Sequence, residues 1–142
     1  MGGSKIIHLS MLDGSIINGG PLLKAPTVCL LVSDGGYSHV GLSSVIERTT
    51  SVGCRYYMTW GKAADILHDV VDEILEQSGD WFEDVVTSSH RSEPPREVAW
   101  FYINAALPSE SDVQYCISYS KETKKLQKLL NECEGYLNRD SC

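Results

Sequence analysis

Side chains that can do chemistry gather in four short segments, each of which follows a run of β-branched or aromatic residues. The segments are Asp34 to His39, Trp60 to Lys62, Ser88 to Arg91 and Tyr119 to Lys121. They supply a carboxylate, two imidazoles, hydroxyls and cations, the groups that a hydrolytic or ligand-binding site uses. The candidate catalytic residues are Asp34, His39, Ser89, His90 and Cys116. The candidate binding residues for a small anionic ligand are Asp34, Gly35, Gly36, Tyr37, Ser38, Trp60, His90 and Arg91.

One arrangement of these residues would serve as a Ser/His/Asp hydrolase. Ser88 or Ser89 would be the nucleophile, His90 or His39 the base, and Asp34 the group that orients the base. The sequence lacks the Gly-x-Ser-x-Gly turn that exposes the nucleophile in one large class of hydrolases. Serines at loop starts more often cap helices or bond to nearby backbone, so the pattern favours structural roles for them.

A second arrangement pairs His90 with Cys116. Val85 to His90, followed by Gln114 to Cys116 on the next strand, resembles the His and Cys pair of caspase-like peptidases, and the predicted order of strands and helices agrees with that fold. The resemblance implies a histidine that holds the thiol as its reactive thiolate. Arg91 replaces the glycine that follows the family's histidine, and the Ala-Cys-Arg-Gly continuation is missing. These departures favour a buried cysteine and a histidine near the surface or rim.

Asp34, Gly35 and Gly36 form a short glycine-containing turn after the first β run. Such a turn can let the backbone approach a phosphate. The three-glycine spacing of a dinucleotide site and the Lys-Ser/Thr ending of a P-loop are both missing. The pattern therefore favours a tight strand-to-helix turn, with Ser38 as the cap of the helix that follows.

Two predicted helices carry charges of one sign. Carboxylates at steps of four, three and four align on one face of the second helix, at Asp65, Asp69, Asp72 and Glu76. That stripe favours a solvated outer face over a cation site. Lysines surround the start of the last helix, where positive charge opposes the helix dipole, at Lys121, Lys124, Lys125 and Lys128. An anion, or the acidic face of another subunit, would neutralise these lysines.

The elements that must position these residues repeat one pattern of strand, polar turn and helix. The predicted strands cover residues 27–33, 54–60, 83–88 and 113–118, and the predicted helices cover 38–50, 62–78, about 92–107, and a last segment from 123. This alternation is typical of a Rossmann-like α/β three-layer sandwich, with a mainly parallel four-stranded central sheet and helices on both faces. Ligands bind where the carboxyl ends of such strands meet, so we expect the four polar segments at one edge.

The predicted domain organisation is an N-terminal hairpin or arm with its connector in residues 1–26, and a single α/β domain in residues 27–142. Asp13 and Gly14 favour a hairpin turn because this dipeptide accepts positive φ angles. The predicted helix around residues 98–107 is apolar on nearly all sides, so it needs cover from the hairpin or from a second copy of the chain. The candidate interface residues are Trp100, Phe101 and Asn104.

Composition limits the class of protein. No run approaches the roughly 18 apolar residues of a membrane span, and the signal-peptide pattern is missing, so we predict a cytoplasmic protein without a membrane partner. A formal net charge of -7 disfavours nucleic acid as a partner. Five cysteines without CxxC or Cys/His metal spacing indicate reduced thiols. We predict neither a metal nor a cofactor.

The chain also resembles a family of small bacterial α/β proteins of unknown function. The resemblance is carried by Leu31 to Tyr37, Cys54 to Tyr57 with Trp60 and Gly61, and the helix that contains Trp100 and Phe101. It implies a bacterial, cytoplasmic protein and no particular activity. Together, the patterns favour a non-enzymatic interaction or regulatory domain that acts through protein contacts and self-associates. The alternative is a small-ligand or hydrolytic site at the rim, of the Cys/His or the Ser/His/Asp type.

Overall fold

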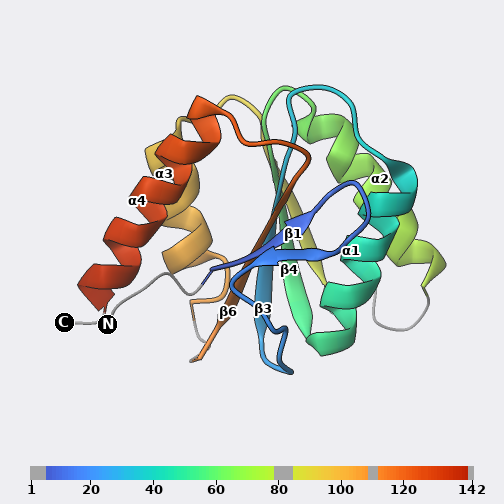
Figure 1. Ribbon diagram of the computed structural model, residues 1–142, viewed down its shortest axis with the longest axis horizontal. Helices are drawn as coiled ribbons and strands as arrows, with labels where there is room; N and C mark the ends of the chain where they lie inside the picture. The colour runs from blue at the N-terminus through green and yellow to red at the C-terminus, as the bar shows by residue number, and fades with distance from the viewer. Residues whose placement is uncertain (1–5, 79–84, 109–111, 141–142) are drawn as a thin grey trace.

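The computed structural model describes residues 6–78, 85–108 and 112–140. Its elements alternate between strands and helices along most of the chain (Figure 1). In order they are β1 (Ile6–Ser10), β2 (Ile16–Asn18), β3 (Thr27–Val32), α1 (His39–Val52), β4 (Cys54–Trp60), α2 (Ala64–Gln77), β5 (Val86–His90), α3 (Pro95–Trp100), the π-helix η2 (Phe101–Ala105), β6 (Gln114–Tyr119) and α4 (Lys124–Asp140).

The strands form one mainly parallel sheet in the order β2-β1-β6-β3-β4-β5. Every neighbouring pair is parallel except β1 and β2, which are antiparallel. The predicted α/β class is therefore confirmed, but the sheet has six strands where the repeated pattern predicted a central sheet of four. The two additional strands are those of the N-terminal hairpin.

The N-terminal hairpin is an integral part of the sheet. Its turn is closed by a 2.8 Å hydrogen bond from the Ser10 N–H to the Ser15 carbonyl, and Gly14 supplies a φ of 78°. Of its two strands, only β2 lies at an edge of the sheet, because β1 pairs with β6 on its other side. Ile6 and Leu9 of β1 are buried, so strands from both sides of residue 26 contribute to one core.

Helices cover both faces of the sheet, which gives three layers (Figure 1). On one face, α1 and α2 pack against side chains such as Cys29 and Leu31 of β3. On the other face, α3, η2 and α4 pack against Leu30 of the same strand. All six residues of β3 are buried, as the apolar composition of a central parallel strand requires. None of the helices in the described ranges is long and apolar enough to cross a membrane.

Strand β5 begins later than its sequence predicts. The predicted strand covered residues 83–88, but β5 runs from Val86 to His90, and residues 83 and 84 lie outside the described ranges. Its hydroxyl groups bond to α2, since the Thr87 and Ser89 hydroxyls donate to Asp72 and Asp65 at 2.7 and 2.6 Å. These contacts explain why a polar segment that looks like a loop remains an edge strand.

The predicted third helix is built from α3 and the π-helix η2. The N–H of Ala106 donates to the Phe101 carbonyl at 2.9 Å, five residues back, and this wider turn leaves carbonyl groups available to other donors. The Ile103 carbonyl accepts a 2.8 Å hydrogen bond from the Tyr115 hydroxyl, and the Tyr102 hydroxyl donates to the Cys116 carbonyl. The π-turn thereby fastens this helix to β6.

A tight turn at Gly61 fixes the edge of the sheet where β4 ends. Gly61 has a φ of 104°, and a Cβ atom there would lie 2.2 Å from the Ser33 carbonyl oxygen. Only glycine meets both the backbone conformation and the close approach. The ends of β3 and β4 are therefore held together at the edge that carries the candidate site.

Candidate functional site

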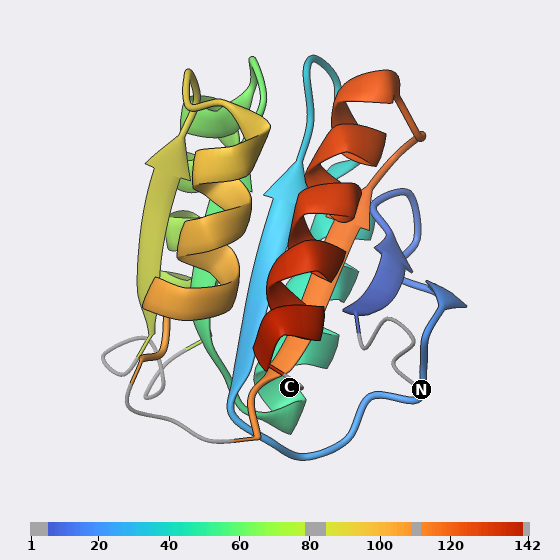
Figure 2. The same cartoon turned by 90° about the vertical axis from the view of Figure 1, so that its left-hand side faces the viewer.

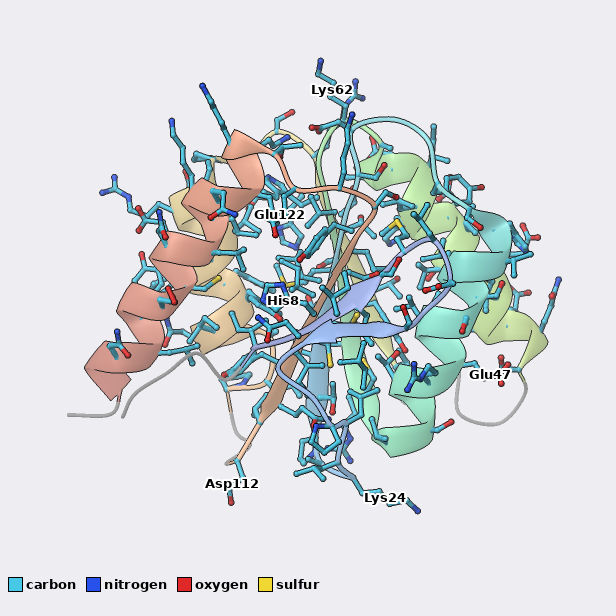
Figure 3. All side chains as sticks on the ribbon, in the orientation of Figure 1. His8, Lys24, Glu47, Lys62, Asp112 and Glu122 are labelled. Atoms are coloured by element: carbon cyan, nitrogen blue, oxygen red, sulfur yellow. The ribbon has the colours of Figure 1, made fainter. Side chains whose placement is uncertain are left out.

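The carboxyl ends of β3, β4, β5 and β6 meet at one edge of the sheet, together with the first turns of α3 and α4 (Figure 2). Lys62 projects from this edge, whereas Lys24 and Asp112 lie at the opposite end (Figure 3). Three of the four polar segments lie at or just beyond strand ends here, as predicted. Ser88, Ser89 and His90 instead lie within β5. Ser88 agrees with the predicted strand range 83–88, whereas the placement of Ser89 and His90 in an exit loop was wrong.

Four of the eight residues that line a groove at this edge are cations, and we call it the basic groove. Its volume is about 450 Å³, and it is lined by Trp60, Arg91, Ser92, Glu93, Pro95, Lys124, Lys125 and Lys128. The cations come from the segment after β5 and from the start of α4. Trp60 and Arg91, two of the predicted ligand-binding residues, therefore line the same groove.

Lys125 connects this groove to the end of β3. Its ammonium group lies 3.1 Å from Asp34 Oδ1 and 4.6 Å from the centroid of the Trp60 ring, within the range of a cation–π contact. The hydrogen bond from the Lys62 backbone N–H, followed by the Lys125 ammonium, lowers the pKa of Asp34. Asp34 therefore remains an anion that holds Lys125 over the indole ring.

The turn after β3 borders a second hollow of about 350 Å³. The hollow is lined by Val32, Ser33, Asp34, Gly35, Gly36, Ser120, Lys121 and Thr123. The turn is held locally, because the Ser33 hydroxyl donates to the Gly36 carbonyl at 2.9 Å. A Cβ atom on Gly35 or Gly36 would meet no other atom within 4 Å, so neither position needs glycine to avoid a steric clash. This geometry agrees with a strand-to-helix turn.

A chain of hydrogen bonds runs from Ser88 through His90 to Glu93. His90 Nε2 lies 2.7 Å from Ser88 Oγ, and His90 Nδ1 lies 2.9 Å from Glu93 Oε2. A carboxylate can only accept, so Nδ1 carries a proton, and in the neutral ring Nε2 accepts from the serine hydroxyl. This connectivity matches a Ser-His-acid relay, with Glu93 in the place where Asp34 was predicted.

The surroundings of this chain favour a structural role. His90 is only 7% exposed, and the ring of Phe101 lies 5.1 Å from its own ring, centroid to centroid. The two hollows that Glu93 borders are lined by neither Ser88 nor His90. The Glu93 backbone carbonyl accepts a 2.8 Å hydrogen bond from Trp60 Nε1. The chain therefore fixes the segment after β5 against the wall of the basic groove.

Ser89 lies on the other face of the sheet, away from the groove. Its hydroxyl donates to Asp65, which also lies 3.6 Å from the guanidinium of Arg91. The neighbouring Thr87 bonds to Asp72 and to His68. Two of the four carboxylates in the predicted acidic stripe, Asp65 and Asp72, thus accept hydrogen bonds from β5, so the stripe is not a purely solvated face.

Cys116 is distant from His90 in the sheet. It lies in β6, which β3 and β4 separate from β5, and it packs with the side chains of the α1 and α2 face, whereas His90 packs against Phe101 on the opposite face. The thiol is completely buried, and this burial raises its pKa well above the ordinary value. The predicted Cys/His pair is therefore not brought together. The two residues lie on strands that are not neighbours, and their side chains point to opposite faces of the sheet, since successive side chains along a strand alternate between its faces.

The residues around the start of α1 have structural positions in or beside that helix. The Ser38 hydroxyl accepts a 3.0 Å hydrogen bond from the Gly41 N–H, which makes Ser38 the predicted cap. His39 is the exposed first residue of α1, and Tyr37 packs partly against the core of that face. None of the three lines the basic groove.

The candidate interface residues lie along α3 and η2. Trp100 is half exposed, whereas Phe101 and Asn104 are partly covered. Trp100 and Phe101 line a hollow with Tyr136 of α4. The apolar third helix is therefore covered by α4 and the sheet, and the hairpin does not cover Trp100.

Sequence reasoning identified the lysines of the groove through their conflict with the helix dipole. It did not identify Glu93 or Arg96. Each is a charged residue next to Pro94 or Pro95, and neither belongs to a repeating pattern of charges that would predict a functional role. In the described ranges, no group of three or more His, Cys, Asp and Glu side chains is arranged to hold a metal ion.

Residues 10–133 match the model of the family described as Domain of unknown function (DUF7684). Searches of curated proteins and of solved structures found no match. The similarity to caspase-like peptidases suggested by His90 and Cys116 is not supported by these comparisons.

Proposed function

The chain belongs to the DUF7684 family of unknown function, and we propose that it is a non-enzymatic binding domain whose groove takes an anionic group of a protein partner. The observation that carries this proposal is the gathering of four cations around one hollow, in a chain whose net charge is -7. They are Arg91, Lys124, Lys125 and Lys128.

The charges of the groove are not balanced internally. Arg91 pairs with Asp65 and Lys125 pairs with Asp34, but neither Lys124 nor Lys128 forms an ion pair within the described part of the chain. The first turn of α4 contains no acidic residue. Each lysine near a helix start costs roughly 0.3 to 1 kcal/mol of helix stability at low salt. A bound anion would remove this unfavourable interaction.

The floor of the groove is held in place before any ligand binds. Trp60 is fully buried, and its indole N–H is fixed by the Glu93 carbonyl. Glu93 in turn is fixed by His90. Preorganisation of this kind reduces the ordering cost of binding.

Anion titrations test the proposal. Inorganic phosphate and a tetra-aspartate peptide should each shift the NMR signal of the Trp60 indole N–H, because Lys125 lies over that ring. The double variant Lys124→Ser with Lys128→Ser should weaken peptide binding about fivefold, from two contacts worth about 0.5 kcal/mol each. Lys24→Ser is the control, since Lys24 lies at the opposite end of the sheet. Equal effects of the variants, or no shift with either anion, would reject the proposal.

We also propose that the protein works in a reducing, cytoplasmic setting. The four cysteines in the described ranges are free thiols, and all four are buried. Buried cysteine commonly serves as a small apolar residue in such a setting.

Acyl-group hydrolysis at Ser88 is a second candidate function. The observation that favours it is the relay from Ser88 through His90 to Glu93. Burial of His90 beneath Phe101 places it second. A fluorophosphonate probe should label Ser88, and Ser88→Ala should abolish the labelling. Absence of label on the unaltered protein would reject this candidate.

A further inference from the structure

Three hollows along α3 and α4 share lining residues, and together we call them the furrow. The basic groove shares Pro95 and Lys128 with a second hollow of about 480 Å³. The second hollow shares Arg96 and Glu97 with a third of about 370 Å³. The third hollow is lined by Glu93, Arg96, Glu97, Trp100, Phe101 and Tyr136.

The chemistry of the furrow changes along its length. Cations dominate at the edge of the sheet. In the middle, the lining includes two cations, Arg96 and Lys128, and two carboxylates, Glu97 and Glu132. The third hollow adds the aromatic residues Trp100, Phe101 and Tyr136, and the half-exposed Trp100 is its largest accessible side chain. Its lining also includes Glu93, which borders the basic groove as well. A ligand that fills the furrow must therefore be anionic at one end and apolar at the other.

The furrow has a definite length because both of its helices begin at the same edge. Helices α3 and α4 lie side by side and run in the same direction away from that edge (Figure 2). A helix rises about 1.5 Å per residue, so Pro95, which lines the basic groove, and Trp100 are separated by about 7.5 Å along α3. An extended polypeptide covers that length with about two or three residues.

We propose that the furrow binds an extended segment of another polypeptide, with Asp or Glu side chains at the basic end and an apolar side chain about three residues away at Trp100. This inference rests on the proposed function and names its partner. A small anion would occupy only the basic end and would leave Trp100 exposed.

A second copy of this chain fits the furrow less well. Its own acidic stripe lies on α2, which packs on the opposite face of the sheet from α3 and α4. A contact between those two faces is head-to-tail, so it closes only into a ring and otherwise grows into open chains. A separate acidic segment meets no such geometric constraint.

Peptides of different spacing test the inference on the full chain. One nonapeptide carries two Asp residues followed three positions later by Phe, and a second has the same composition with Phe beside the Asp pair. The spaced peptide should bind about fivefold more tightly, and it should shift the indole N–H signals of both Trp60 and Trp100. A tetra-aspartate peptide should shift only the Trp60 signal.

Matched variants separate the two ends of the furrow. Trp100→Ala should weaken the spaced peptide about fivefold and leave tetra-aspartate binding unchanged. Lys124→Ser with Lys128→Ser should weaken both peptides. Equal affinity of the two nonapeptides, or no effect of Trp100→Ala, would overturn the inference while the anion-binding proposal stands. Failure of every acidic probe to bind would overturn both, and a shift from monomer to dimer that excludes the peptide would assign the furrow to a second copy.

Discussion

Asp34 competes with any incoming anion for Lys125. The carboxylate lies 3.1 Å from the ammonium group and also accepts the Lys62 N–H at 3.0 Å. An asparagine in this position would keep an oxygen for the Lys62 N–H but would lose the charge that holds Lys125. The basic groove is thus partly neutralised by the chain itself.

The variant Asp34→Asn should therefore strengthen the binding of acidic peptides. We expect a gain of about threefold, which corresponds to roughly 0.6 kcal/mol, the scale of an exposed ion pair. Isothermal titration calorimetry at constant ionic strength measures it. Asp13→Asn is a suitable control because Asp13 is an exposed carboxylate of the hairpin turn, bonded to Ser15. An unchanged or lower affinity of Asp34→Asn would contradict the competition.

His8 makes stability depend on pH. Its Nδ1 lies 2.9 Å from the Tyr119 hydroxyl, and burial lowers its pKa below the ordinary value of 6.5, although Glu122 opposes this effect. As the pH falls, the unfolded chain binds a proton at His8 before the folded chain does. The free energy of unfolding should therefore decrease from about pH 6.5 down to the lowered pKa of the folded state.

The variant His8→Asn removes this contribution. Urea unfolding at about pH 7.5 and about pH 5 should show a smaller loss of stability for His8→Asn than for the unaltered protein. His39→Asn provides the comparison, since His39 is exposed at the start of α1. The same pH dependence in His8→Asn and the unaltered protein would show that other groups cause it.

At the level of single residues, the sequence predicted some parts of the candidate site and not others. Lysines at the start of α4 were visible because their charge conflicts with a helix dipole, which is a local property. The roles of Glu93 and His90 were not visible, because they depend on which face of β5 each side chain occupies and therefore on a strand boundary.

The first helix and the hairpin loop touch at Gly41. A Cβ atom on Gly41 would lie 2.0 Å from the Met11 carbonyl oxygen and 2.5 Å from that of Leu12. This helical glycine is therefore required by close packing of backbone on backbone. In contrast, Gly35 has open space around it.

Alanine at these two glycines should have very different effects. Gly41→Ala should lower the free energy of unfolding by about 1 to 3 kcal/mol, because the hairpin loop must move despite the gain in helix propensity. Gly35→Ala should change it by about 0.5 kcal/mol or less. Chemical denaturation of both variants measures the difference, and similar stabilities would contradict the packing of the hairpin loop on α1.

Elements with a strong local pattern were predicted well from sequence. Strand β4 agrees with its predicted range, and α2 begins two residues later than predicted and ends one residue earlier. The π-turn of η2 was not predicted, because it depends on the hydroxyls of Tyr102 and Tyr115 finding partners across the core. Strand β5 was misplaced because its hydroxyls are satisfied by α2, a contact that periodicity does not reveal.

At the scale of the whole molecule, self-association stays a prediction. Trp100 is half exposed, and an exposed aromatic side chain is a frequent anchor of protein contacts. If the chain associates through this surface, Trp100→Glu should lower the mass measured in solution from that of an oligomer to that of a monomer. Light scattering over a range of concentrations provides the measurement. An oligomer that persists in Trp100→Glu would place the contact elsewhere.

The position of β1 has a consequence for the order in which the molecule is completed. β1 comes first along the chain, yet its parallel partner β6 comes last among the strands, and the bonded residues His8 and Tyr119 are 111 positions apart. On the ribosome, the hairpin emerges long before its partner exists and must wait with its apolar side chains unprotected. Such exposure invites capture by nascent-chain chaperones, and release from them would await the synthesis of β6.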